Sequence, residues 1–316
     1  TAAQWTSIPD DFSSRCRKAG ITKLWASFEP ADYHDPKTAF GDWFDNDEWT
    51  NKFLPSLTFV ATTLKAKGWT GIAFDNEMYP GVNSRQPTWQ WNFPGNTHTE
   101  AEVRAQARLR GTQIAGVLAA HFPGAELMTY HDYFGDATNY GYHSLLEHAV
   151  NREPLNQYAR NEVKVNFYDG LTSVPGALGR LTIGDASFYY GATRGGGMTM
   201  NDRQAMQFAA NGTTAYLQRT LTNKAVNVFP EPMVLLGPSN GDGSPYTVEQ
   251  AMTPDRALVV AKAARAASTG GIVINYCPSD VKDPAAVANF TGDVVNGVPR
   301  LHNADLRPAY LAAAGR

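Results

Sequence analysis

The chain has 316 residues, of which 43% are hydrophobic and 18% are charged, and its formal net charge is -3. This composition excludes a disordered protein and suits one large globular domain over residues 1–316. The slight negative charge gives no basic field for a nucleic-acid backbone, and no apolar run reaches the roughly 20 residues of a membrane span. We therefore expect neither a nucleic-acid nor a membrane partner.

The first part of the chain alternates between predicted helix and predicted strand. Residues 8–19 have a helical pattern behind Ser7, which is a favourable N-cap residue. Residues 21–28 form an apolar stretch that predicts a strand ending at Glu29. Residues 53–67 carry apolar side chains at the spacing of a helix that packs on a sheet.

Aromatic residues are frequent, with 7 Trp, 14 Tyr and 15 Phe. Trp43 and Trp49 stand near Asp45 in a predicted loop, and Trp89 and Trp91 lie in another. Exposed aromatic and polar loops of this kind suit a ligand that is flat, hydroxylated and neutral. We therefore interpret Trp89 and Trp91 as sugar-stacking residues.

The sequence Gly-Ile-Ala-Phe-Asp-Asn-Glu at residues 71–77 is the most informative stretch of the chain. Its apolar start suits a strand buried on both faces, and a Pro-Gly pair at residues 80–81 stops it. Alternation along a strand places Asp75 and Glu77 on one side, at the carboxyl end where α/β proteins bind ligands. Two carboxylates on one face repel each other unless one is protonated, so this pair indicates a function rather than a turn.

The remainder of the chain continues the alternation. Thr99 and Glu102 form a capping-box pattern for a helix that runs to about residue 121. Further strands are predicted at residues 126–130, 181–186, 226–229 and 271–276. Further helices are predicted at about residues 143–175, with a break at Pro154, at residues 201–221 and at residues 254–268, where Thr253 is the cap. The tail from residue 283 is interpreted as partly helical.

Strands that alternate with helices predict an α/β protein with a parallel sheet covered by helices. The aromatic loops after the strands favour a (β/α)8 TIM-type barrel over an open sheet, and no Gly-x-Gly-x-x-Gly indicates a dinucleotide site. A barrel needs two strands more than the six predicted. Either two strands lie in segments interpreted as loop or helix, or the first one or two strand–helix units precede Thr1.

Residues 70–77, followed by Tyr-Pro-Gly at residues 79–81, resemble the fourth-strand signature of family-18 glycoside hydrolases, the chitinase group. That signature is Asp-Gly-x-Asp-x-Asp-x-Glu, often followed by Tyr-Pro-Gly. Met-Thr-Tyr at residues 128–130 is similar to the Met-x-Tyr strand of the family. The resemblance implies a barrel in which Glu77 is the general acid and Asp75 is its partner.

The chain departs from the family pattern at several positions. Thr70 and Ala73 stand where the signature has acids, and Met78 is inserted before the tyrosine. Tyr130 falls one strand after Glu77, where the family places it two strands later. The resemblance therefore favours a barrel glycosidase more than a chitinase in particular.

The chemistry of a glycosidase can be argued from the residues themselves. Cleavage needs a carboxylic acid that protonates the leaving oxygen, and a second carboxylate or a substrate acetamide at the oxocarbenium-like centre. Glu77 reaches further than Asp75 and is the better acid, and Glu231, held extended between two prolines, is the first choice for the second carboxylate. No cofactor is expected. The residues expected to contact the carbohydrate substrate are Glu29, Trp89, Trp91, Tyr130, His131, Asp132, Asp185, Tyr189 and Tyr276.

Two alternatives from other functional classes remain open. A set of side chains could hold a divalent metal for hydrolysis of a phosphate or an amide, although no His-x-His or His-Glu-x-x-His motif is present. That set is Asp75, Glu77, His131, Asp132 and Asp185. A lectin-like barrel could instead bind glycan without cutting it, but the retained pair of acids counts against this.

The compartment and the state of the cysteines are less constrained. Thr1 opens a polar segment without the apolar core of a signal peptide, so the hypothesis of a secreted or periplasmic protein requires that the signal has been removed. Cys16 and Cys277 could form one disulfide or remain two separate thiols.

Overall fold

The computed structural model describes residues 13–14, 16–18, 22–28, 42–75, 91, 96–132, 162–185, 217, 221, 226–230, 233–235, 254–267, 275–277, 294–295, 298–299 and 312. The chain forms two compact units. The first comprises Thr1–Asp132, Asn156–Ile183 and Thr214–Asn227, and the second comprises Tyr133–Leu155, Gly184–Thr213 and Val228–Arg316. The single domain expected from the sequence stays a prediction.

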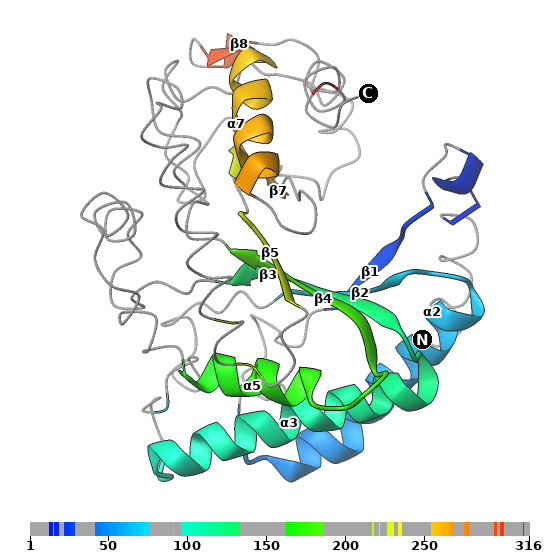
Figure 1. Cartoon of the computed structure of the whole chain (residues 1–316), viewed down its shortest axis with the longest axis vertical. Helices are drawn as coiled ribbons and strands as arrows, with labels where there is room; N and C mark the ends of the chain where they lie inside the picture. Colours follow the sequence, from blue (N-terminus) through cyan, green and yellow to red (C-terminus); the bar gives the residue numbers. More distant parts are fainter. Residues whose placement is uncertain are drawn as a thin grey trace. The chain divides into compact units, whose positions relative to one another are not determined.

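Five strands form one parallel sheet in the order β1-β2-β3-β4-β5, so strands that are consecutive in the chain are neighbours in the sheet (Figure 1). They are Trp25–Phe28, Gly71–Asp75, Ala125–Asp132, Leu178–Asp185 and Val226–Pro230. The α/β class and the parallel sheet predicted from the sequence are confirmed. Each of these strands overlaps a predicted strand, with boundaries that differ by up to four residues.

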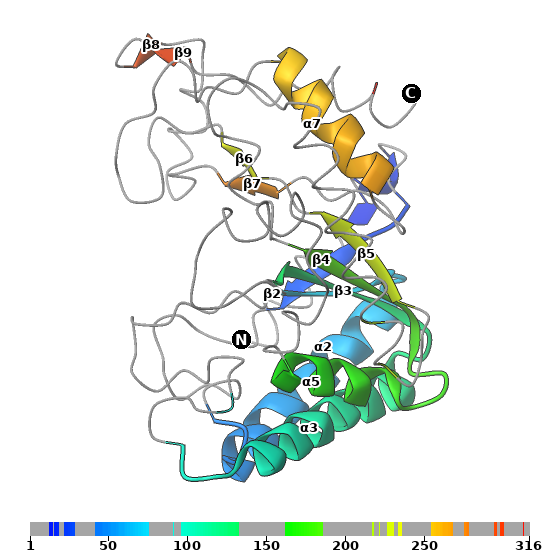
Figure 2. The same ribbon diagram turned by 60° about the vertical axis from the view of Figure 1, so that its left-hand side comes forward.

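Three helices connect the first four strands and lie on the same face of the sheet (Figure 1, Figure 2). Helix α2 (Leu54–Ala66) joins β1 to β2, α3 (Glu100–His121) joins β2 to β3, and α5 (Glu162–Thr172) joins β3 to β4. Crossover helices of this kind are what parallel neighbours require, because the chain must return to the same end of the sheet before each strand.

The helical segment before α2 begins earlier than the sequence predicts. A π-helical turn, η2 (Glu48–Phe53), precedes α2. The backbone N–H of Glu48, the first residue of the turn, donates to Oδ1 of Asp45 at 2.9 Å. Asp45 therefore has a local structural role in a segment interpreted from the sequence as loop.

The start of α3 is as predicted. Thr99 is the N-cap residue, and the Glu102 carboxylate accepts a 2.7 Å hydrogen bond from the Thr99 backbone N–H. The hydroxyl of Thr99 accepts in turn from the backbone N–H of Glu102 at 3.4 Å. The capping box is thus complete, and it satisfies two of the donors that a helix N-terminus otherwise leaves unpaired.

Helices α3 and α5 approach each other closely through glycines. A Cβ added to Gly111 would lie 2.1 Å from the carbonyl oxygen of Phe167, and one added to Gly170 would lie 2.0 Å from the carbonyl oxygen of Arg108. Both distances are far below a van der Waals contact. Glycine is therefore needed at both positions for the two backbones to pack at this separation.

Aromatic side chains link the helical layer to the sheet. Trp43 and Trp49 are both 0% exposed, and their rings stack with centroids 5.8 Å apart. Trp49 packs edge-on against Phe53 at 5.1 Å, and Phe53 packs against Phe28 at the end of β1 at 5.6 Å. The expectation of exposed ligand-binding aromatics is therefore wrong for these two tryptophans, because both complete the core between helices and sheet.

The second unit contains α7 (Pro254–Ala267) and two small sheets. Strands β6 (Met233–Leu235) and β7 (Asn275–Cys277) pair in parallel. Strands β8 (Val294–Val295) and β9 (Val298–Pro299) pair antiparallel. Helix α7 begins at Pro254, as predicted, since proline suits the first turn of a helix. The antiparallel β8–β9 pair was not predicted from the sequence, and the partly helical tail stays a prediction.

Two further observations concern membrane-spanning helices and Cys16. Within the described ranges, no helix is both long enough and apolar enough to cross a membrane. Cys16 is a free thiol that is partly buried.

Candidate functional site

The carboxyl ends of β2 and β3 bring together several of the residues predicted to act on a substrate. Asp75 is the last residue of β2, and it lies opposite Tyr130 of β3 in the parallel register. His131 and Asp132 complete β3, which extends two residues beyond the predicted end. We call these four residues, Asp75, Tyr130, His131 and Asp132, the strand-end site.

The strand that leads to Asp75 is buried, as the sequence predicts. Ile72 and Phe74 are 0% exposed, and Ala73 is 4% exposed. A fully buried strand in a parallel sheet is held by hydrogen bonds on both edges and by packing on both faces. The backbone of Asp75 is therefore at the end of a rigid element, which suits a residue that must be placed accurately.

The two faces of the sheet differ beside the strand-end site. Phe28, Phe74 and Thr129 are opposite one another in register and lie on the face that the helices cover. The preceding row, Ser27, Ala73 and Met128, is on the other face by the alternation of strand side chains. Ser27 is exposed and Met128 is partly buried.

Each strand of the five-stranded sheet ends at an acidic residue or directly before one in the sequence. β2, β3 and β4 end at Asp75, Asp132 and Asp185, while β1 and β5 end immediately before Glu29 and Glu231. Asp185 belongs to the second unit. The predicted placement of acids at strand ends therefore agrees with the observed strands.

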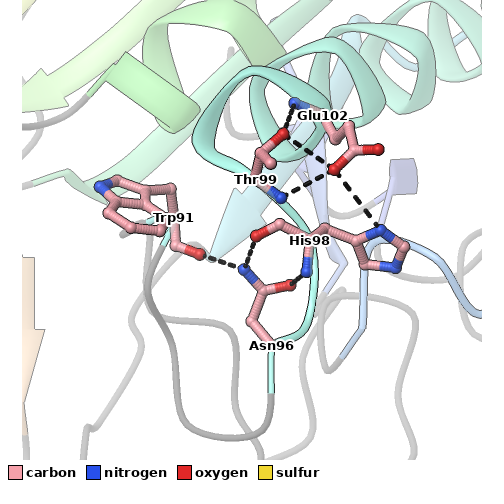
Figure 3. Close-up of polar contacts among 5 residues, drawn as sticks. All are labelled: Trp91, Asn96, His98, Thr99 and Glu102. Atoms are coloured by element: carbon pink, nitrogen blue, oxygen red, sulfur yellow. Dashed lines mark hydrogen bonds and ion pairs between the residues drawn. The ribbon is translucent and has the colours of Figure 1, made fainter.

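Trp91 is the predicted stacking residue that the structure describes. Its side chain is 40% exposed. The amide Nδ2 of Asn96 donates to the carbonyl oxygen of Trp91 at 2.7 Å and to that of His98 at 2.8 Å (Figure 3). Asn96 also accepts from the His98 backbone N–H at 2.9 Å. The Trp91 backbone is thus tied to the start of α3, and its stacking role stays a prediction.

The remaining predicted site residues divide into two groups. Tyr276 lies in β7, in the second unit. Five others fall outside the described residues, so their roles stay predictions: Glu29, Glu77, Trp89, Tyr189 and Glu231. A search of the residues that the structure describes finds no group of three or more His, Cys, Asp or Glu side chains arranged to hold a metal ion.

Sequence reasoning missed Arg110, a cation inside the helical layer. Arg110 is 1% exposed, and its guanidinium carbon lies 5.0 Å from the centre of the Trp49 ring. Burial lowers its pKa, and the nearby carboxylates of Asp42 and Asp45 act in the opposite direction. The sequence carries a signal for this residue, since Arg110 occurs at the spacing of the buried face of α3, which includes Val103, Ala107 and Ile114.

Comparisons of the chain with protein-family models, curated protein sequences and solved structures found no significant match.

Proposed function

We propose that this protein is a glycoside hydrolase that cleaves O-glycosidic bonds of a poly- or oligosaccharide, with Glu77 as general acid and Asp75 as its partner. The observation that carries the proposal is the position of Asp75. It ends a buried strand of a parallel sheet and lies opposite Tyr130 on the next strand. Enzymes built on parallel sheets place their catalytic residues at this end of the strands.

A (β/α)8-type barrel is the architecture that we propose for the sheet. Doubly wound sheets reverse their strand order at a switch point and carry helices on both faces. Here five consecutive strands follow one another without a reversal, and the three described crossover helices share one face (Figure 2). This sequential order with one-sided helices is the pattern of a barrel wall.

The chemistry that we propose follows from the spacing of the two acids. We expect Asp75 on the same face as Ala73, and Glu77 two residues beyond it, because strand side chains alternate. Two neighbouring carboxyl groups push each other's pKa apart, so Glu77 can keep a proton for the leaving oxygen while Asp75 is ionised. Tyr130, His131 and Asp132 then offer polar groups to substrate hydroxyls, and Glu231 is the first choice for a second carboxylate.

The experiment is release of reducing sugar from a panel of polysaccharides and aryl glycosides, with and without chelator. The variants are Glu77→Gln and Asp75→Asn, and the matched control is Glu126→Gln. Glu126 lies on the same strand as Tyr130 but near its amino end, where it forms a 2.8 Å ion pair with Lys23. We expect activity that resists chelator, that falls by about 100-fold or more in Glu77→Gln, and that stays unchanged in Glu126→Gln.

Other outcomes would point to the alternatives. Loss of wild-type activity on adding chelator would replace the carboxylate mechanism with a metal-dependent one. Glycan binding by the wild type without any release of reducing sugar would indicate a binding module. Equal activity in Glu77→Gln and the wild type would remove Glu77 from the mechanism.

A further inference from the structure

A buried hydrogen bond joins the helical layer to β3 immediately before the strand-end site. The hydroxyl of Tyr168 on α5 donates to Oγ1 of Thr129 on β3, at an oxygen–oxygen distance of 3.3 Å. Both side chains are 0% exposed. A bond between buried hydroxyls resists exchange with water, so it can fix the two elements relative to each other.

The helix that carries Tyr168 is itself held in place. Gly111 of α3 packs against the carbonyl oxygen of Phe167, the residue before Tyr168. Asp169, the residue after it, accepts a 2.7 Å hydrogen bond from Nε of Arg108 in an ion pair. Contacts on both sides of Tyr168 therefore limit rotation and sliding of α5. They also fix the position at which the Tyr168 hydroxyl meets the sheet.

Thr129 is the residue through which this restraint reaches the strand-end site. It lies opposite Phe74 in register, and the next pair along the same two strands is Asp75 and Tyr130. A shift of the β3 backbone at Thr129 would displace Tyr130 relative to Asp75. The hydrogen bond from Tyr168 opposes such a shift. This bond lies on the helix-covered face of the sheet, whereas we expect Asp75 to act on the opposite face.

We propose that Tyr168 is a positioning residue, which fixes the carboxyl end of β3 through Thr129 and thereby sets the placement of Tyr130 against Asp75. Its part in catalysis rests on the proposed glycoside hydrolase function. Its mechanical part does not, because the hydrogen bond and the strand register are independent of the reaction. The two parts can be tested separately.

The mechanical part is tested by hydrogen–deuterium exchange of the intact chain. Tyr168→Phe removes the hydroxyl and keeps the ring, while Thr129→Val removes the partner oxygen with little change in volume. The control is Thr172→Val, since the Thr172 hydroxyl donates to the Tyr168 carbonyl oxygen at 3.0 Å within α5. We expect faster exchange at residues 129–132 in the first two variants, by about 10-fold, and wild-type exchange there in the control.

The catalytic part is tested by kinetics on any substrate that the wild type cleaves. A misplacement of catalytic groups by an ångström can cost up to about 100-fold in rate, so we expect kcat of Tyr168→Phe and of Thr129→Val to fall by about 10-fold with KM within about twofold. Thr129→Ser keeps the hydroxyl and should restore kcat. The double variant should lose less than the sum of the two single losses, because both changes remove the same bond.

The outcomes separate the two proposals. Unchanged exchange at residues 129–132 in both Tyr168→Phe and Thr129→Val would overturn the positioning role, whatever the activity of the chain. Faster exchange with an unchanged kcat would overturn its part in catalysis. A wild type that cleaves no glycan would contradict the proposed function alone, and the exchange result would still decide whether Tyr168 fixes β3.

Discussion

Arg110 donates a hydrogen bond from Nε to the carbonyl oxygen of Trp43 at 2.9 Å, although the two residues are 67 positions apart. The same guanidinium donates from Nη2 to Asn46 at 2.7 Å and from Nη1 to Gln113 at 3.0 Å. Gln106 donates to the same Trp43 oxygen at 3.0 Å. The segment before α2 is therefore held against α3 by a buried cation that donates to the neutral oxygens of Trp43, Asn46 and Gln113.

Arg110→Lys should destabilise the protein by about 2 to 4 kcal/mol, because lysine keeps the charge but cannot reproduce three directed bonds from one planar group. The measurement is urea unfolding followed by tryptophan fluorescence, to which the buried Trp43 and Trp49 contribute. The control is Arg108→Lys on the same helix, whose side chain is 45% exposed and should cost no more than about 0.5 kcal/mol. Equal urea midpoints for Arg110→Lys and Arg108→Lys would contradict the role of Arg110 in holding this segment against α3.

The glycine contact between α3 and α5 predicts opposite effects for the same substitution at two positions of one helix. A Cβ at Gly111 would overlap the backbone of α5, whereas a Cβ at Gly116 meets nothing within 4 Å. Gly111→Ala should therefore cost about 2 to 4 kcal/mol by overpacking against backbone. Gly116→Ala should stabilise by up to about 1 kcal/mol, because alanine is the better helix former.

The measurement is again the urea midpoint of each variant against the wild type. A stabilising Gly111→Ala would show that α3 and α5 can separate without loss of packing. That result would also contradict the inference that packing of α5 on α3 holds Tyr168 in a fixed position.

The elements with a local cause could be predicted from the sequence. The capping box of Thr99 and Glu102 depends on residues three positions apart, and the structure contains it. The antiparallel β8–β9 pair was missed although the sequence carries a signal for it. Asn-Gly at residues 296–297 separates Val-Val from Val-Pro, and Asn-Gly favours a two-residue turn between antiparallel strands. The prediction of a partly helical tail did not take this Asn-Gly turn signal into account.

The contacts that depend on tertiary packing could not be predicted. Nothing near Trp43 or Trp49 in the sequence shows that both are covered, since their burial depends on Phe167 and Arg110, which arrive from other helices. The same applies to the bond between Tyr168 and Thr129. The acids at the strand ends could be located from pattern alone, but the register that pairs Asp75 with Tyr130 follows from the strand alignment.

The start of α3 should lose stability in acid. The Thr99 backbone N–H and, to a smaller extent, the Thr99 hydroxyl donate to the Glu102 carboxylate and lower its pKa below the usual 4.5 (Figure 3). His98, whose Nδ1 lies 4.0 Å from Oε2 of Glu102, lowers this pKa further. A carboxyl group whose pKa is lower in the folded state stabilises the fold above its unfolded pKa. This contribution is lost as the pH falls through the folded pKa.

We therefore expect the difference in urea midpoint between the wild type and Glu102→Gln to be largest near pH 7 and to narrow below about pH 4. In a Thr99→Ala background, which itself costs about 1 kcal/mol, the Glu102→Gln change should have a smaller effect. A difference between the wild type and Glu102→Gln that stays constant from pH 7 to pH 3 would contradict the capping role of this carboxylate.

Gly71→Ala should remove stability and activity together, because a Cβ at Gly71 would overlap the backbone of β3 on the strand that leads to Asp75. A Cβ there would lie 1.7 Å from the carbonyl oxygen of Glu126, the residue opposite in register. The two strands would have to separate, at a cost of about 2 to 4 kcal/mol, and Asp75 would move relative to Tyr130.

Urea unfolding and sugar release, measured on the same preparation of Gly71→Ala, test this prediction. The contrasting variant is Glu77→Gln, which should lose activity and keep the wild-type urea midpoint. An active Gly71→Ala variant with a wild-type midpoint would show that the strand-end site does not depend on this β2–β3 contact.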